Sequence, residues 1–207
     1  MKDPINRRSI PGYSMALVII PFLTGCMVYI NNGGYGYLNE AEKQHFQPFP
    51  AEISLTSGYD TTALIIYRLC EQDIQKILKS YDYTWVHIWA PYCPSADHAG
   101  LLNKLQIAAT TAGQRLNVLL ISSSYDYDAI KSRVSNSHYP YPVYVLDEAC
   151  FGSSRGKALR HLHRVLHHHQ VSGKRGFFGD YLLKDTTVVK EAWHLSVNEV
   201  DSLISAH

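Results

Sequence analysis

Residues 84–96, TWVHIWAPYCPSA, join an apolar run to a loop that contains a single cysteine. The first part, TWVHIWA, is rich in aromatic and β-branched side chains and has the length of a core strand, which predicts a buried strand at residues 84–90. Pro91 and Pro94 then indicate a loop at the end of this strand. Cys93, between the two prolines, is therefore the first candidate site residue.

Strand and helix patterns alternate on both sides of this stretch. Short apolar runs predict further strands, and amphipathic periodicity predicts helices between them. Near the C-terminus, two apolar segments with a turn between them indicate a hairpin, and Ser196 with Glu199 forms a capping box for a last helix. This order predicts an α/β fold with a central mixed β-sheet flanked by helices. Strands are expected at 63–69, 116–124 and 141–147, helices at 71–80, 96–113, 127–136 and 156–169, and the hairpin at 180–193.

The loop and the order of elements resemble the thioredoxin superfamily, more closely its exported TlpA-like or redoxin-like branch. The matching pieces are VHIWAPYC, VLLISSS, YPVYVLD, YLLKDTTVV and VNEVDSLI, which together span residues 60–205. The resemblance implies a thioredoxin-like fold. It also implies thiol chemistry at a Trp-Ala-x-x-Cys-x-x-Cys loop, in which one cysteine attacks and a second one resolves the mixed disulfide.

This chain departs from that pattern at the second cysteine. Cys93 matches the attacking cysteine, and Ala96 stands where the resolving cysteine belongs. We expect Cys93 at the N-terminus of a helix, with Pro94 in the first turn, where the helix dipole lowers the pKa of a thiol. Without a neighbouring thiol, release from a mixed disulfide is slow. Asp97 or His98 is a candidate to assist the thiol, and at most one of them faces it.

Two functions therefore stay open. One is thiol-disulfide or peroxide-type chemistry at Cys93, with an external thiol or the non-adjacent Cys150 as the resolving group; its partner is then a protein thiol. The other is a redox-inactive protein that binds a peptide or an envelope partner on the same scaffold, with Tyr125 and Tyr127 as candidates to line a groove. The reactivity of Cys93 distinguishes the two.

The resemblance also implies a substrate groove beside the loop. The family's cis-proline position falls at Phe178 and Gly179 in the redoxin register, and at Pro142 in the shorter thioredoxin register; we expect the redoxin register, because it leaves YLLKDTTVV as the edge hairpin. His87 takes the place of the buried acid that some thioredoxins carry. The residues predicted for the groove are Trp89, Pro91, Tyr92, Pro94, Phe178 and Gly179.

The N-terminus has the features of an export signal. Basic residues precede an apolar run at 15–23, which is too short to span a bilayer, and Leu-Thr-Gly-Cys at 23–26 resembles the lipobox of bacterial lipoproteins. We therefore predict a signal peptide at 1–25, a lipidated N-terminus and tether at 26–59, and a thioredoxin-like domain at 60–207. Cys26 would carry the lipid, and the protein would face the periplasm or the exterior on the membrane of a bacterial cell envelope.

The net charge bears on nucleic-acid binding, and the number of cysteines bears on the state of the thiols. A formal net charge of +1 and the absence of a long basic run argue against nucleic-acid binding. After removal of the signal, Cys70, Cys93 and Cys150 remain besides Cys26. Three is an odd number, so at least one of these thiols is expected to be free or to pair with another molecule.

The histidine-rich helix at 156–169 raises the question of a metal. His163 and His167 are four residues apart and would share one face, which is workable spacing for zinc or copper. No carboxylate or cysteine lies within a turn of them, and Arg160 and Arg164 beside them would oppose a cation. The sequence therefore favours a solvated basic helix, and it predicts no metal and no cofactor.

Overall fold

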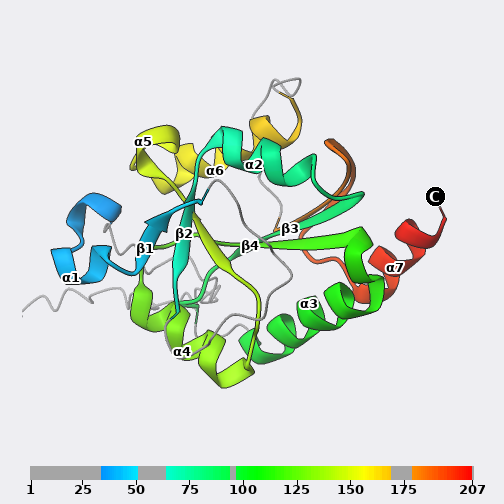
Figure 1. Cartoon of the computed structure of the whole chain (residues 1–207), viewed down its shortest axis with the longest axis horizontal. Coiled ribbons are helices and arrows are strands. Elements are labelled where there is room, and N and C mark those ends of the chain that lie inside the picture. Colours follow the sequence, from blue (N-terminus) through cyan, green and yellow to red (C-terminus); the bar gives the residue numbers. More distant parts are fainter. Residues whose placement is uncertain (1–33, 51–63, 94–96, 169–178, 207) are drawn as a thin grey trace, which may run out of the picture.

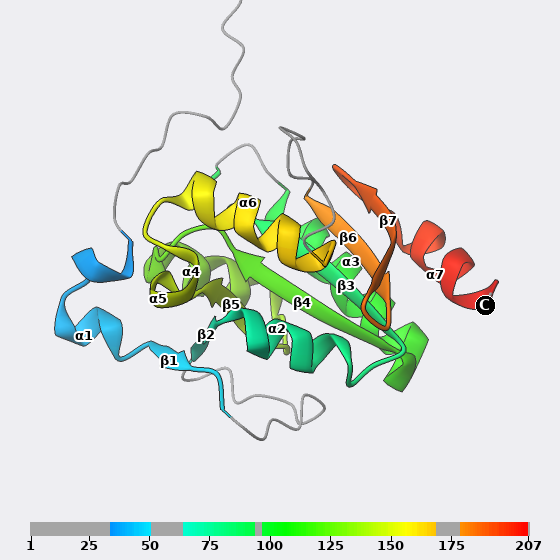
Figure 2. The ribbon, with the colours of Figure 1, turned by 90° about the horizontal axis from the view of Figure 1, so that it is seen from above.

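The computed structural model describes residues 34–50, 64–93, 97–168 and 179–206. These residues form one seven-stranded sheet with the order β1-β2-β5-β4-β3-β6-β7, covered by helices on both sides (Figures 1 and 2). The predicted class, an α/β fold with a central mixed sheet flanked by helices, is confirmed. Within the described ranges, no helix is both long and apolar enough to cross a membrane.

The sheet is parallel from β1 to β3 and antiparallel at its other edge. Strands β1, β2, β5, β4 and β3 run in one direction, and the hairpin β6–β7 joins the edge of β3 in the antiparallel sense. The turn of the hairpin uses Asp185 at a φ of 52°, a left-handed conformation that aspartate tolerates. The strands are β1 (Phe46–Pro48), β2 (Ile66–Leu69), β3 (Tyr83–Trp89), β4 (Leu116–Ser122), β5 (Val143–Leu146), β6 (Asp180–Lys184) and β7 (Thr187–Ala192).

Helices α3, α4 and α7 cover one face of the sheet, and α2, α5 and α6 cover the other (Figure 1). Alternation along β3 divides its side chains between the two cores, with Trp85 and Trp89 on the first face and Val86 on the second. The predicted capping box of α7 is present. The helices are α1 (Glu40–Lys43), α2 (Glu71–Leu78), α3 (His98–Ala112), α4 (Tyr127–Ser137), α5 (Glu148–Phe151), α6 (Arg155–Leu166) and α7 (Val197–Ser205).

The positions of β5 and β6 decide between the two registers. β5, which lies within the stretch YPVYVLD, is between β2 and β4 and parallel to both, whereas β6 pairs with β3 in the antiparallel sense. This is the arrangement that the redoxin register predicts. Pro142 is not the cis-proline of the alternative register, because the described residues contain no cis peptide bond.

Part of the predicted tether belongs to the folded domain. β1 pairs with β2, and Phe46 at its start is only 2% exposed. The backbone N–H of Gly36 donates to Glu148, whose carboxylate packs so closely on Gly34 that a Cβ there would clash. The predicted boundary at residue 60 is therefore wrong for residues 34–50, because hydrogen bonds and aromatic burial hold them on the sheet. Residues 1–33, with Cys26, lie outside the described residues.

Candidate functional site

Cys93 lies in the turn that follows β3. Its backbone N–H donates to the carbonyl of Ala90 at 3.1 Å, and its side chain is buried, with 4% exposure. The described part of α3 begins only at His98, where the carboxylate of Asp97 accepts a hydrogen bond from the backbone N–H of Gly100. The prediction that Cys93 occupies a helix N-terminus is therefore wrong, because Asp97 takes the capping position.

His98, rather than Asp97, turns toward the loop. The indole N–H of Trp89 donates to His98 Nδ1 at 2.9 Å, and His98 Nε2 lies 2.7 Å from the carbonyl oxygen of Cys93. An indole N–H can only donate, so Nδ1 carries the lone pair and Nε2 carries the proton that the Cys93 carbonyl accepts. Burial lowers the pKa of His98, and the charge of Arg133 adds to this effect. A neutral His98 thus ties the loop to the end of β3.

The cysteines of the described residues are all oxidised. Cys70, the N-cap residue of α2, and Cys150, in α5, form a disulfide with their Cα atoms 5.5 Å apart. Cys93 is disulfide-bonded as well, and no free thiol remains in the described ranges. In this state Cys150 cannot resolve a mixed disulfide at Cys93, since its sulfur is bonded to Cys70. That predicted role would require prior reduction of the Cys70–Cys150 bond.

A buried histidine–carboxylate pair lies on the same face of the sheet as the Trp89–His98 contact. His87 on β3 is paired with Asp180 on β6, and its Nδ1 is 2.7 Å from Asp180 Oδ1. The indole of Trp85 donates to the same oxygen at 2.6 Å, and the backbone N–H of Leu195 donates to Oδ2 at 2.9 Å. The carboxylate of the pair thus comes from β6, and β3 contributes the histidine.

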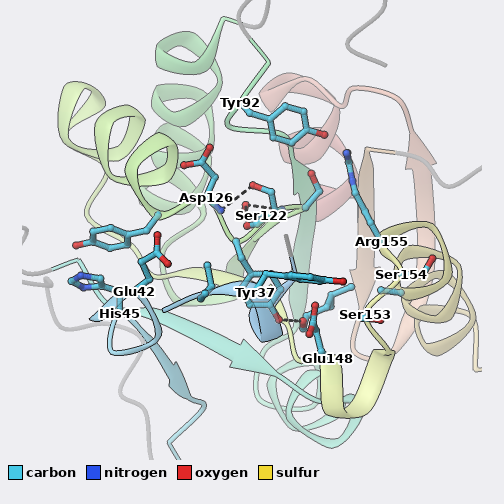
Figure 3. A pocket seen from close by; sticks show the side chains of 18 of the residues that line it. Tyr37, Glu42, His45, Tyr92, Ser122, Asp126, Glu148, Ser153, Ser154 and Arg155 are labelled. Atoms are coloured by element: carbon cyan, nitrogen blue, oxygen red, sulfur yellow. Dashed lines mark hydrogen bonds between the residues drawn. The ribbon is translucent and has the colours of Figure 1, made fainter. Parts of the chain in front are cut away.

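A cavity of about 950 Å³ opens beside the loop, between the N-terminal segment and the C-terminal ends of β4 and β5. Figure 3 shows Tyr92 and Arg155 at one end of it and Glu42 with His45 at the other. The guanidinium of Arg155 lies 5.2 Å from the centre of the Tyr92 ring. Crevices at the carboxyl ends of parallel strands are common ligand sites, and this volume is in the usual range for one.

The residues predicted for the groove have different environments. Tyr92 lines the cavity, as do Tyr125 and Tyr127, but Trp89 does not, because it is buried in the core with its indole bonded to His98. Pro91 is buried. Gly179 contributes its carbonyl to the N–H of Ile88, and a Cβ there would meet the carbonyl oxygen of Trp193 at 2.6 Å, so a close backbone approach explains this glycine. Pro94, Ala96 and Phe178 lie outside the described residues.

Sequence reasoning missed several residues of this region. Cys70 and Cys150 both follow the ends of predicted parallel strands, which would have placed them at one edge of the sheet if β2 and β5 had been recognised as neighbours. Asp180 is an acid at the start of the hairpin strand that pairs with β3, and this position could have indicated its contact with His87. Arg155 gave no signal, since a basic residue at the start of a helix is common.

Comparisons with known proteins give distant structural matches. The sequence matches no family model and no curated protein. Among solved structures, it is similar to a thioredoxin-family thiol:disulfide interchange protein of Chlorobium tepidum, with 15% identity over 64% of this chain and 83% of that one, and a TM-score of 0.45. The thioredoxin domain of a thiol-disulfide oxidoreductase of Bacteroides vulgatus shows 14% identity over 62% and 83% of the two chains, with a TM-score of 0.40.

StoA of Bacillus subtilis is a further similar structure, with 12% identity over 60% of this chain and 82% of that one, and a TM-score of 0.39. With TM-scores below 0.5, these likenesses carry no argument about this chain. The element order and the sheet topology of the chain itself agree with the thioredoxin-like fold that its sequence resembles.

Proposed function

We propose that this chain is a thioredoxin-fold protein of the bacterial cell envelope that exchanges disulfides at Cys93 with a protein partner. The observation that carries the proposal is that Cys93, itself buried, directly follows Tyr92, which lines the cavity where a partner segment would lie. The side chain of His98 contacts the carbonyl group of Cys93 through Nε2. Exchange starts from the Cys93 thiolate, so the disulfide-bonded form of Cys93 has to be reduced first.

The exchange proceeds in two displacements. The Cys93 thiolate attacks a disulfide of the partner, an S–S bond between Cys93 and the partner forms, the partner's own S–S bond breaks, and its leaving sulfur takes up a proton. An external thiol then gives up its proton and attacks the partner's sulfur in the mixed disulfide, so that a new disulfide forms and Cys93 leaves as a thiolate. One disulfide of the partner is exchanged for another, with no net gain or loss of electrons. Because Ala96 stands at the resolving position, the second thiol comes from outside the loop.

The first test is a redox titration of the folded chain in glutathione buffers. After alkylation, mass spectrometry would follow the Cys93 peptide and the Cys70 and Cys150 peptides in the same digest. We expect Cys93 to exchange reversibly and to form a mixed disulfide with glutathione in buffers that leave Cys70–Cys150 oxidised, since structural disulfides resist the glutathione pool. If Cys93 exchanges only after denaturation, the proposal fails.

Ala96→Cys is a matched gain-of-function variant, because it restores the Cys-x-x-Cys spacing in the sequence. A thiol held beside Cys93 acts at a far higher effective concentration than a free one, so mixed disulfides should be released much faster. We expect the variant to reduce a disulfide-bonded protein substrate with multiple turnovers, and Ala96→Ser, the control of similar size, to behave as the natural chain does. Equal rates for both variants would argue against a redox role of Cys93.

The anchor proposed at Cys26 has its own test. In a bacterial host, the natural chain should fractionate with membranes, and Cys26→Ser should be released into the soluble envelope fraction. Recovery of both chains in the soluble fraction would remove the lipid anchor from the proposal. It would leave the chemistry at Cys93 untouched.

The cavity favours a second function, binding of an extended peptide without redox chemistry. Tyr37, Tyr92 and Arg155 line it and offer aromatic surface and one cation to a peptide. In a screen of peptides against the Cys93→Ser chain, binding that survives this substitution and is lost in Arg155→Ala would support the binding function. Loss of all binding with Cys93 would support covalent exchange instead.

A further inference from the structure

Two histidines and a glutamate come together on the face of the sheet that α6 covers. His163 and His167 are four residues apart on α6 and its C-cap, so their side chains point the same way. Glu191 reaches them from β7. Each of the three side chains offers a ligand atom, and these atoms all lie within 4.8 Å of one another.

The packing of α6 on the hairpin explains this convergence. Register pairs Tyr181 of β6 with Glu191 of β7, so both side chains leave the sheet on the same face. Tyr181 belongs to the hydrophobic core that the apolar side of α6 shares, through Leu162 and Val165. Figure 2 shows α6 lying over the sheet with its C-terminal end toward the hairpin. The missing carboxylate of the histidine helix is therefore supplied by a strand 24 residues further along the chain.

We propose that His163, His167 and Glu191 bind a divalent transition-metal ion of the zinc type. Two imidazoles and one carboxylate are a ligand set that zinc accepts, with a fourth position open to water. Zinc–ligand bonds of this kind place neighbouring tetrahedral ligand atoms about 3.4 Å apart. The distance of 2.9 Å from His167 Nε2 to Glu191 Oε2 lies below this value and the outer limit of 4.8 Å lies above it, so side-chain adjustments of about an ångström close the site.

Tyr181 orients one of the ligands. Its hydroxyl lies 3.1 Å from His163 Nδ1, and both side chains are buried. With Nδ1 turned to this hydroxyl, Nε2 is the nitrogen that would coordinate. Metal-binding histidines commonly have such a partner on the second ring nitrogen, where it fixes the orientation of the ring. Tyr181 is thus a positioning residue of the proposed site.

The site is partly open to solvent. The side chains of His167 and Glu191 are 20% and 22% exposed, which gives an ion a way in. Arg160 and Arg164 are exposed on α6, whereas His163 is buried. Glu191 also offsets the positive charge of a bound cation.

The test is a calorimetric titration of the purified full-length chain with Zn²⁺, after removal of the purification tag and of chelators. We expect one ion per chain. His167→Ala and Glu191→Gln should each weaken binding by at least about 100-fold, and Tyr181→Phe by about 10-fold, because loss of an outer partner costs less than loss of a ligand. Circular dichroism would verify the fold of each variant, and Glu191→Gln keeps an oxygen that can accept from His167.

Two controls separate this site from incidental binding. His161→Ala removes a histidine of the same helix that contacts Glu71 instead. The double variant His168→Ala with His169→Ala breaks the run of three histidines in the sequence. Both should keep the affinity of the natural chain.

Co²⁺ gives a readout that does not depend on affinity. The intense visible bands of a four-coordinate Co²⁺ complex should appear with the natural chain and disappear with Glu191→Gln. Three results would overturn the proposal. They are the absence of metal binding by the natural chain, the loss of metal binding in the double variant His168→Ala with His169→Ala, or an affinity and a Co²⁺ spectrum that Glu191→Gln leaves unchanged.

Discussion

Two histidine–carboxylate pairs lie on opposite faces of the sheet, and they differ in how fully the carboxylate is engaged. Asp180, in the pair with His87, accepts hydrogen bonds from two side chains and one backbone N–H, and both members of the pair are buried. Glu191, in the pair with His167, accepts one hydrogen bond within the described part of the chain, and both members are partly exposed.

The difference separates a structural pair from a candidate ligand pair. A buried carboxylate with three donors has most of its acceptor sites occupied, and its removal leaves all three donors without a partner. A partly exposed carboxylate with a single donor can exchange that donor for a cation at low cost. Both pairs join an imidazole to a carboxylate, so their surroundings decide which pair is available for chemistry.

The largest expected effect is at the buried pair. Asp180→Asn replaces one acceptor oxygen by an NH₂ group that faces a donor, so we expect the free energy of unfolding to fall by about 3 kcal/mol, as when a buried pair loses one member. Urea denaturation at pH 7 measures this. Asp185→Asn in the same hairpin is the control, and it should stay within about 0.5 kcal/mol, because asparagine tolerates a positive φ. A loss below 1 kcal/mol at Asp180, on the order of a surface pair, would break the comparison.

The next effect tests a buried histidine without a carboxylate. His98→Leu leaves the indole N–H of Trp89 and the carbonyl of Cys93 without their partner, which should cost about 2 kcal/mol. His194→Gln, at an exposed histidine, should stay within about 0.5 kcal/mol. If the two variants are equally stable, the Trp89–His98–Cys93 contact does not hold the loop.

The same residue predicts a pH dependence with a definite sign. Burial lowers the pKa of His98 in the folded chain from the ordinary histidine value of 6.5. When the pH falls below 6.5, the unfolded chain therefore binds a proton at this histidine that the folded chain does not bind. The free energy of unfolding should therefore fall as the pH drops through 6.5, and the His98 contribution should be fully present above it. Urea midpoints at two pH values, one on each side of 6.5, should differ less in His98→Leu than in the natural chain. An unchanged difference would contradict the prediction.

A smaller effect is expected at the tyrosine beneath the open pair. Tyr181→Phe removes one buried hydroxyl and the hydrogen bond to His163, and should cost about 1 kcal/mol of stability. Phenylalanine keeps the ring and its packing. A fall in the free energy of unfolding well above about 2 kcal/mol would therefore show that the Tyr181–His163 contact matters for stability as much as the buried pair does. Thermal and urea unfolding would measure it.

The smallest effect is expected at the open pair itself. Glu191→Gln should change the free energy of unfolding by less than about 0.5 kcal/mol in the presence of a chelator, as for other partly exposed ion pairs. With zinc at about 100 times its dissociation constant, the natural chain should gain about 2.7 kcal/mol and the variant much less. If Glu191→Gln lowers the free energy of unfolding by several kcal/mol in the absence of metal, both pairs have a structural role.

Much of the fold could be predicted from local patterns. The apolar runs, the amphipathic periods and the capping box of Ser196 and Glu199 each depend on neighbours in sequence, and the structure has the corresponding strands and helices. The start of α3 was placed too early, because the prediction followed the family's loop rather than the capping ability of Asp97. The tether was extended too far, since β1 is a three-residue strand that becomes stable only when paired with β2.

The sequence by itself determined the elements, the α/β class, and the loop in which Cys93 stands without a cysteine at Ala96. Only the tertiary structure decided which side chains meet: Cys70 with Cys150, Asp180 with His87, and Glu191 with the two histidines of α6. The physical reason is that sheet pairing and helix packing set these contacts. A sequence pattern records the period of an element, and the register between elements follows from how their apolar faces fit together.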